Sequence, residues 1–234
     1  MKIEELFQNL SYAELSNLSI SNEGSGEIAA PKHNALVGYT NSALLALYSR
    51  FVLREGQVPL RCKSHITTYR MESRYSTIGH VVGSTDPVYI EDSVAHPFED
   101  DFIKVLGVYG PGGCRKSIND QDDPNGVFTP QPAVLQIPYP VEGQVLNIIY
   151  QARHKKLEFG DLNQEVDVPA VLETALTSYI AHMVFTFMNG QENAAKAAEY
   201  LTKYEIACTE VEKNDLVNNS ASGNHTKFCK RGFV

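Results

Sequence analysis

The part of the chain most suited to chemistry is a glycine-rich segment that ends in lysine and serine. Gly110–Ser117 has the sequence Gly-Pro-Gly-Gly-Cys-Arg-Lys-Ser. Such a loop can bind phosphate through its backbone N–H groups when a glycine precedes the lysine and a helix follows. Here Arg115 precedes Lys116, and no helical pattern follows. We therefore predict a surface turn, and a phosphate- or nucleotide-binding α+β enzyme that uses Gly110–Ser117 remains an alternative.

An acidic stretch, Asp120–Asn125, follows this segment and resembles a fragment of a calcium-binding loop. A dedicated calcium loop supplies an oxygen ligand at its third ligating position and closes with a bidentate glutamate. In this chain Pro124 stands at that position, and no glutamate closes the loop. We expect a turn that binds a cation only opportunistically, so no metal site is predicted.

Histidine and cysteine give no catalytic or metal-binding pattern. The seven histidines form no His-Glu-x-x-His or Glu-x-x-His motif, and the sequence has no Gly-x-Ser-x-Gly motif. The cysteines form no Cys-x-x-Cys pair and have no zinc-finger spacing, so we expect them to be free thiols. They are Cys62, Cys114, Cys208 and Cys229. We therefore predict that the chain is not an enzyme and that it has no catalytic residue and no cofactor.

Composition and charge narrow the class of protein further. The chain has 234 residues, of which 43% are hydrophobic and 21% charged, which is typical of a globular protein. Its net charge of -8 argues against a broad nucleic-acid-binding surface, since such surfaces carry an excess of lysine and arginine. No apolar run has the length needed to span a bilayer, so no association with a membrane is expected.

Hydrophobic residues recur at helical spacing in the first and last thirds of the chain. Residues 1–57 are predicted to form an N-terminal arm and a first long helix that begins at Pro31 and ends before Gly56 and Pro59. Residues 161–213 are predicted to hold the C-terminal helices, which begin at Pro169 and at Gln191. The positions expected in the helical core are Leu44, Leu47, Tyr48, Phe51, Leu172, Leu176, Tyr179, Met183 and Phe187.

The last helix is expected to pack closely through small side chains on one face. This face comprises Ala194, Ala195, Ala198, Leu201, Tyr204, Ala207 and Val211.

Residues 58–160 have a different pattern of short β-like runs separated by glycine and proline turns. The predicted strands are 65–70, 88–91, 102–108, 133–137 and 145–150. Residues 214–234 lose the helical period and end in hydrophobic and basic residues, which predicts an extended tail. The expected fold is therefore α+β, a helical bundle with long C-terminal helices and a β-rich insertion between the first long helix and the last helices.

Charged residues gather in basic and acidic clusters. They belong either to an ordinary solvated surface or to complementary surfaces of neighbouring subunits, and periodicity does not choose between these interpretations. The basic clusters are Arg61, Lys63, Arg70 and Arg74, and residues 153–156; the acidic ones are residues 91–92 and 99–101, and Asp120, Asp122 and Asp123.

Five segments together resemble a known family. They are Glu14–Leu18, Leu45–Phe51, Tyr150–His154, Phe187–Asn193 and Lys227–Val234. In order and texture they are similar to the head-to-tail adaptors of short-tailed bacteriophages, also called neck proteins or tail tubular protein A. The resemblance covers most of the chain, although none of the segments is a mechanistic motif.

The resemblance implies a structural protein of the virion, made in the host cytoplasm and located in the neck or tail. It implies a homo-oligomeric ring, a dodecamer, that joins the portal protein to the tail nozzle or tail tube. Double-stranded DNA would pass through the lumen during ejection without specific binding. The C-terminal tail would dock on the portal through Phe228, Lys230, Arg231 and Phe233. A different neck or tail-completion protein is the alternative within this class.

Overall fold

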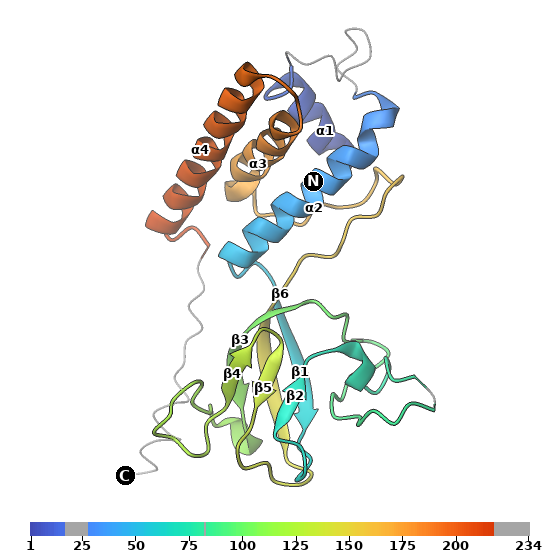
Figure 1. Ribbon diagram of the computed structural model, residues 1–234, viewed down its shortest axis with the longest axis vertical. Coiled ribbons are helices and arrows are strands. Elements are labelled where there is room, and N and C mark those ends of the chain that lie inside the picture. The colour runs from blue at the N-terminus through green and yellow to red at the C-terminus, as the bar shows by residue number, and fades with distance from the viewer. Residues whose placement is uncertain (17–27, 82, 218–234) are drawn as a thin grey trace. The chain divides into compact units, whose positions relative to one another are not determined.

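The computed structural model describes residues 1–16, 28–81 and 83–217. The chain is a mixed α+β protein, and this described part contains four α-helices and two small antiparallel sheets. It divides into two compact units (Figure 1). The helical unit comprises Met1–Phe51 and the described residues from His154 onward, and the β unit comprises Val52–Arg153.

The helical unit begins with a short amphipathic helix, α1 (Ile3–Tyr12). Ile3, Leu6 and Leu10 lie on one face and are fully buried, as expected for residues three and four positions apart. The N-H groups of the first helical turn lack intrahelical partners. Two of them donate outside the helix, from Ile3 to the Gln164 carbonyl and from Glu4 to the Leu162 carbonyl, both at 3.1 Å.

Helix α2 (Ala30–Arg50) has Pro31 in its first turn, where a missing N–H costs nothing. The helix ends at Arg50 because Phe51 adopts an extended conformation, while the Phe51 N–H still donates to the Leu47 carbonyl at 2.8 Å. Asn41 of α2 forms two hydrogen bonds with Leu157, which follows the β unit in the chain. Its amide nitrogen donates to the Leu157 carbonyl at 3.0 Å, and its amide oxygen accepts the Leu157 N–H at 2.9 Å.

Helices α3 (Glu173–Thr186) and α4 (Gln191–Lys213) pack against each other, and α3 also packs on α2. A short 3-10 turn, Ala170–Leu172, leads into α3. Gly190, with φ of 117°, separates α3 from α4 in a conformation that favours glycine. The buried residues of α3 are Ala175, Leu176, Ser178, Ile180, Ala181, Val184 and Phe185.

One predicted core position is wrong. Phe187 follows the last residue of α3 and is 66% exposed, with its ring stacked on Tyr39 at 5.6 Å between centroids. The helix ends one residue earlier than the hydrophobic pattern suggests, and Phe185 is buried instead. Of the other predicted core positions, Tyr179 and Met183 are partly buried, and the rest are buried: Leu44, Leu47, Tyr48, Phe51, Leu172 and Leu176.

The predicted packing face of α4 is also wrong in large part. Ala194, Ala195, Ala198 and Leu201 are exposed, whereas the buried residues of α4 are Ala197, Tyr204, Cys208 and Val211. Only a narrow face of α4 is buried, and the exposed alanines lie beside it. Alanine is a good helix former, so it is also common on exposed helix surfaces.

Gly38 lies within α2, and a Cβ built there meets no atom within 4 Å. Glycine in a helix interior costs about 0.5–1 kcal/mol relative to alanine, because its backbone loses more freedom on folding. We therefore expect Gly38→Ala to stabilise the helical unit by about this amount. Slower hydrogen exchange of the α2 amides would be the measurement, and faster exchange would contradict the prediction.

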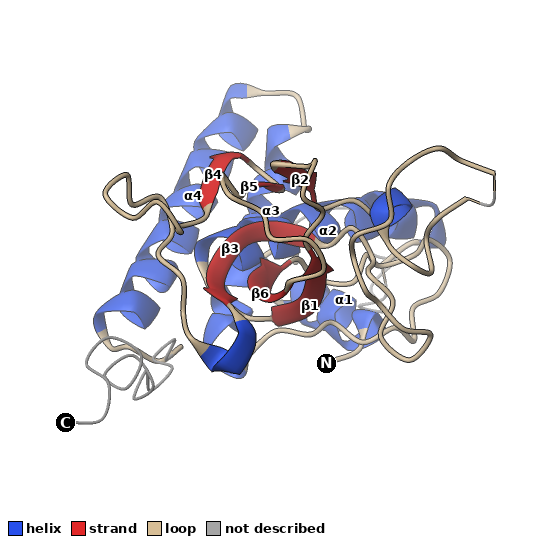
Figure 2. Ribbon diagram, turned by 90° about the horizontal axis from the view of Figure 1, so that it is seen from below, coloured by secondary structure: helices blue, strands red, loops and turns tan. Residues whose placement is uncertain are grey.

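The β unit contains two three-stranded antiparallel sheets. The first has the order β1-β6-β3, with β1 (Glu55–Arg61), β6 (Val145–Ala152) and β3 (Phe102–Tyr109). The second has the order β2-β5-β4, with β2 (Thr68–Arg70), β5 (Val134–Gln136) and β4 (Phe128–Gln131). The first sheet is strongly curved (Figure 2), and two register irregularities in β3 contribute to this curvature.

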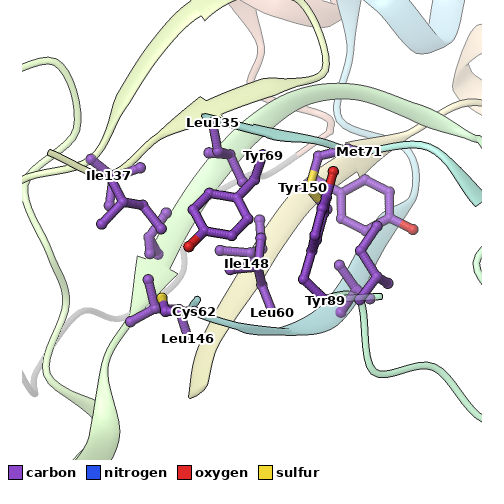
Figure 3. Packing of buried hydrophobic residues seen from close by; sticks show 14 of the residues in the cluster. Leu60, Cys62, Tyr69, Met71, Tyr89, Leu135, Ile137, Leu146, Ile148 and Tyr150 are labelled. Atoms are coloured by element: carbon purple, nitrogen blue, oxygen red, sulfur yellow. The ribbon is translucent and has the colours of Figure 1, made fainter. Parts of the chain in front are cut away.

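One hydrophobic cluster lies between the two sheets (Figure 3). Leu60 of β1 and Leu146 and Ile148 of β6 project toward Tyr69 of β2 and Leu135 of β5, and all five are fully buried. On β1, and on β6 as far as Tyr150, the buried residues occupy alternate positions, as a strand with one covered face requires, and Gln151 and Ala152 at the end of β6 are buried as well. Strand β1 lies at the edge of this sheet, next to β6.

Strands β1 and β4 have no counterpart among the predicted strands, and each contains a proline, Pro59 or Pro130. Pro59 is compatible with β1 because this residue faces away from β6, so the sheet loses no N–H. Gly56 and Pro59, expected to lie beyond a helix end, instead lie inside a strand. As a result the β unit runs from Val52 to Arg153, which differs at both ends from the expected range of 58–160.

Candidate assembly surfaces

The Gly110–Ser117 segment forms a turn that follows β3. The Gly113 N–H donates to the Gly110 carbonyl at 3.1 Å, and the Lys116 ammonium group donates to the Asn125 carbonyl at 3.0 Å. A 3-10 turn at Pro111–Gly113 is followed by extended backbone and not by an α-helix. The segment therefore lacks the helix N-terminus of a phosphate-binding loop, and its lysine is held by the loop itself.

The carboxylates of Asp120–Asn125 stabilise their own turn. Asp123 accepts the Ser117 hydroxyl at 2.6 Å and the Asn125 N–H at 2.9 Å, while Asp120 accepts the Asp122 N–H at 3.1 Å. These bonds are typical of aspartates in turns. Among the described residues, no group of three or more histidine, cysteine, aspartate or glutamate side chains is placed to hold a metal ion.

Two of the predicted free thiols, Cys62 and Cys208, are buried and free. Burial raises the pKa of both thiols, so neither has the thiolate character of a nucleophile. Cys114 is disulfide-bonded, so the prediction of a free thiol is wrong for this residue.

Several residues of the charged clusters pair within the chain. Arg61 binds Glu91, Arg74 binds Glu72 at 2.8 Å, and Arg54 lies 3.7 Å from Asp101. The first two pairs lie between exposed side chains, and such pairs contribute about 0–1 kcal/mol each. They supply no direct support for charge complementarity between subunits at these positions.

Two apolar grooves lie in the described part of the helical unit. Groove A, of about 420 Å³, lies between the end of α1, the first half of α3, and α4. Tyr200 and Ala207 contribute to its apolar part, together with Ile206, which is 54% exposed. Glu14 and Lys203 also line it, so groove A combines apolar surface with charged side chains, as protein interfaces commonly do.

Groove A is held in shape by specific contacts. The Tyr200 hydroxyl donates to the Glu14 carbonyl at 3.1 Å, and the Thr177 hydroxyl donates to the Glu14 carboxylate at 2.8 Å. The Tyr200 ring stacks on Phe185 with 5.5 Å between centroids. Because these contacts already fix its walls, a partner would find groove A largely formed.

Groove B, of about 190 Å³, lies between α2 and the end of α3. Its lining includes Leu36, Tyr39 and Val184, together with Phe187 and Met188, which are 66% and 37% exposed. Large exposed hydrophobic residues that gather at one place commonly mark an interaction site. The stacked Tyr39 and Phe187 rings make groove B an aromatic surface.

Arg50 fixes α4 against the C-terminal end of α2. Its guanidinium group donates to Glu205 and to Glu212, each at 2.7 Å. The hydrogen bond from Arg50 lowers the pKa of the Glu212 carboxyl group, and the same pairing raises the pKa of Arg50. These bonds help to hold the helix that lines groove A.

The two grooves have no lining residue in common. Thr174 and Ser178 of α3 line groove A, whereas Val184 lines groove B. A subunit with two different binding surfaces can form head-to-tail contacts, and such contacts close into a ring when the rotation between subunits allows it.

Neither groove was predicted from the sequence. The hydrophobic pattern placed Phe187 in the core and did not single out Ile206. The predicted portal-docking residues, Phe228, Lys230, Arg231 and Phe233, lie outside the described residues. No helix within residues 1–16, 28–81 or 83–217 has the length and apolar character to cross a membrane.

Comparisons with known proteins give no family assignment. No protein-family model matches the chain, and a search of curated proteins also found no match.

Proposed function

We propose that this protein is a ring-forming head-to-tail adaptor that joins the portal of a short-tailed bacteriophage to its tail. In this proposal the helical unit is a bundle into which the β unit is inserted. The observation that carries the proposal is the pair of different apolar grooves on the helical unit, with Ile206 exposed in one and Phe187 in the other. The family resemblance of the sequence supports the same function.

The two grooves favour a ring over a twofold dimer. A twofold dimer buries the same patch of both subunits, whereas a ring buries two different patches of every subunit. We propose that groove A of one copy receives the Phe187 side of groove B of the next copy. A large aromatic side chain is a favourable anchor for such a contact, because it buries much apolar area with few rotatable bonds.

The charge of the chain suits a channel through which DNA slides. A net charge of -8 at pH 7 does not favour tight binding of phosphates, and acidic groups in a lumen would repel the duplex from the wall. The DNA would therefore pass without specific binding.

The decisive experiment is to measure the mass of the purified protein, alone and mixed with the portal protein of its phage, by native mass spectrometry or light scattering. We expect a closed ring of defined stoichiometry, a dodecamer, in one or both samples. A monomer that remains indifferent to the portal would contradict the adaptor proposal and favour the alternatives, a tail-completion protein or an enzyme that uses Gly110–Ser117.

The C-terminal tail provides a second test. Deletion of residues 224–234 is expected to abolish attachment to the portal, since the resemblance assigns that contact to Phe228, Lys230, Arg231 and Phe233. We expect folding of the reduced chain to be nearly unchanged, because this part of the sequence has no core pattern, and reduction takes the disulfide of Cys114 out of the comparison. Co-sedimentation with the portal measures attachment, and circular dichroism measures folding. A large drop in the melting temperature of the truncated chain would show that the tail belongs to the core.

A further inference from the structure

The edge of the first sheet in the β unit is open along part of β1. Near the end of β1, the Arg61 N–H donates to the Tyr89 carbonyl at 2.8 Å, and the Pro59 carbonyl accepts the Glu91 N–H at 2.9 Å. The backbone groups of these two odd-numbered residues therefore point away from β6. A short segment around Ile90 covers this part of the edge.

The other odd-numbered residues of β1, Glu55 and Gln57, must point in the same direction. The pairing of β1 with β6 is unbroken from Glu55 to Arg61, and the Arg54 carbonyl accepts the Ala152 N–H of β6 at 2.9 Å. The even-numbered residues thus face β6, and the N–H and C=O groups of Glu55 and Gln57 face outward. In the described part of the chain, no partner is recorded for these four groups.

This open edge forms one wall of a groove of about 770 Å³, which we call the β1 groove. Residues 92–93 and 95–99 line its other side, and Asp92 forms two hydrogen bonds there. The Asp92 carboxylate accepts the Phe98 N–H at 3.0 Å and the Ile78 N–H at 2.9 Å. The wall opposite the strand edge is therefore anchored, and the volume of the groove gives room for an extended segment beside β1.

The β1 groove is acidic. The carboxylates that line it are Glu55, Glu91, Asp92, Glu99 and Asp101, and the only lysine or arginine among its lining residues is Arg54. Glu91 binds Arg61, and Asp101 lies near Arg54. Within the described residues, no cationic partner is recorded for Glu55 or Glu99, which leaves both carboxylates available to a ligand.

We propose that the β1 groove binds an extended segment of a partner protein that carries lysine or arginine, and that this segment adds as a strand to Glu55 and Gln57. Backbone hydrogen bonds to a sheet edge give such complexes affinity, and the side chains along the groove give them specificity. A second copy of β1 is a poor occupant, because it would bring another Glu55 into an acidic groove. The proposal does not depend on the formation of a ring.

The test uses the full chain, labelled with ¹⁵N, and three blocked hexapeptides. The first is Val-Lys-Val-Lys-Val-Lys, which is basic and favours an extended conformation. The second replaces each lysine by glutamate. The third keeps the lysines but carries N-methyl groups on alternate backbone nitrogens, which removes the donors on one edge and leaves the charge unchanged. Peptide-dependent shifts and slower exchange of the Glu55 and Gln57 amides report binding.

We expect the basic peptide to bind and to protect both amides, with affinity that falls as salt is added. The acidic and N-methylated peptides should each bind at least about tenfold more weakly, since each loses interactions that together are worth roughly 1.4 kcal/mol or more. Absence of binding by the basic peptide would overturn the proposal. Equal binding of the N-methylated peptide would show that the groove binds peptides by charge alone, without addition of a strand, which would contradict the proposal.

Two variants locate the site. Gln57→Pro removes one outward N–H at a position with the same orientation as Pro59 and should prevent protection of the edge. The double variant Glu55→Lys, Glu99→Lys leaves the backbone intact and should weaken the basic peptide about tenfold or more. Unchanged binding by a folded double variant would overturn the proposal.

A synthetic peptide of residues 224–234 is the final probe. If this peptide binds more tightly than the hexapeptide, the occupant is a tail of this chain and the proposed partner is wrong.

Discussion

Replacement of Phe187 by glutamate is expected to abolish ring formation, and so is replacement of Ile206 by glutamate. Each substitution puts a charge into one of the two proposed contact surfaces. Burial of an unpaired charge at an interface costs about 3 kcal/mol or more, which corresponds to a roughly hundredfold loss of affinity at every contact of the ring. Because both residues are more than half exposed, at 66% and 54%, we expect each variant to fold.

A mixture of the two variants distinguishes ring contacts from twofold contacts. The Phe187→Glu variant keeps groove A, and the Ile206→Glu variant keeps groove B, so one copy of each can still bind. Native mass spectrometry of the mixture should show a complex of one copy of each variant and nothing larger. Homodimers of either variant alone would indicate twofold contacts and contradict the proposed pairing.

Thr202→Glu is the matched control for this experiment. Thr202 is an exposed residue of α4 that lines neither groove, so a charge there should leave the ring intact. All variants are compared under the conditions in which the unmodified chain forms its ring. If the control also loses the ring, the effect comes from added negative charge and not from the grooves.

Gly56→Ala is expected to destabilise the β unit severely. Gly56 lies opposite Tyr150 in the neighbouring strand, and a Cβ at Gly56 would come within 2.3 Å of the Tyr150 Cζ atom. The Tyr150 ring has little freedom to move away, since it stacks on Phe102 with 4.9 Å between centroids. Its hydroxyl also donates to the buried Asp101 carboxylate at 2.9 Å.

Displacement of Tyr150 would combine overpacking with the loss of a buried hydrogen bond. We expect a cost of about 2 kcal/mol or more, because each effect alone typically amounts to about 1–3 kcal/mol. Hydrogen exchange of the β6 amides measures this change within the β unit. Unchanged exchange in the Gly56→Ala variant would contradict the prediction.

The double variant Gly56→Ala, Tyr150→Val tests the cause. A valine at position 150 leaves space for the new methyl group, so Gly56→Ala should cost little in the Tyr150→Val background. Such a large coupling between two substitutions is expected only for residues in contact. If the two effects simply add, the destabilisation has a source other than the close approach of these residues.

The local helical pattern of the sequence was enough to predict the positions of the long helices. Proline in the first turn and the hydrophobic spacing indicated α2, and the predicted start of a new helix at Gln191 separated α4 from α3. These signals lie within the helices that they predict. The buried face of α4 was harder to predict. Either the face with the alanines or the face with Tyr204 and Cys208 could have been buried, and the position of α3 decides between them.

The edge strand β1 and both grooves could not be predicted for a related reason. Gly56 and Pro59 are unfavourable in an isolated strand, and they fit here because Tyr150 covers one and the other faces away from β6. Ile206 and Phe187 are ordinary hydrophobic residues in the sequence. Only the three-dimensional arrangement shows that they remain exposed, so their role could not be inferred from spacing alone.

The pairing of β1 with β6 has a consequence for the modularity of the chain. Glu55 lies opposite Gln151, so the chain enters and leaves the β unit through neighbouring strands. Because the two ends of the unit lie side by side, a short loop can replace it. Another unit with similarly spaced ends can also take its place, and the path of the remaining chain does not change. Exchange of the β unit would therefore leave the sequence of the helices that carry grooves A and B unchanged.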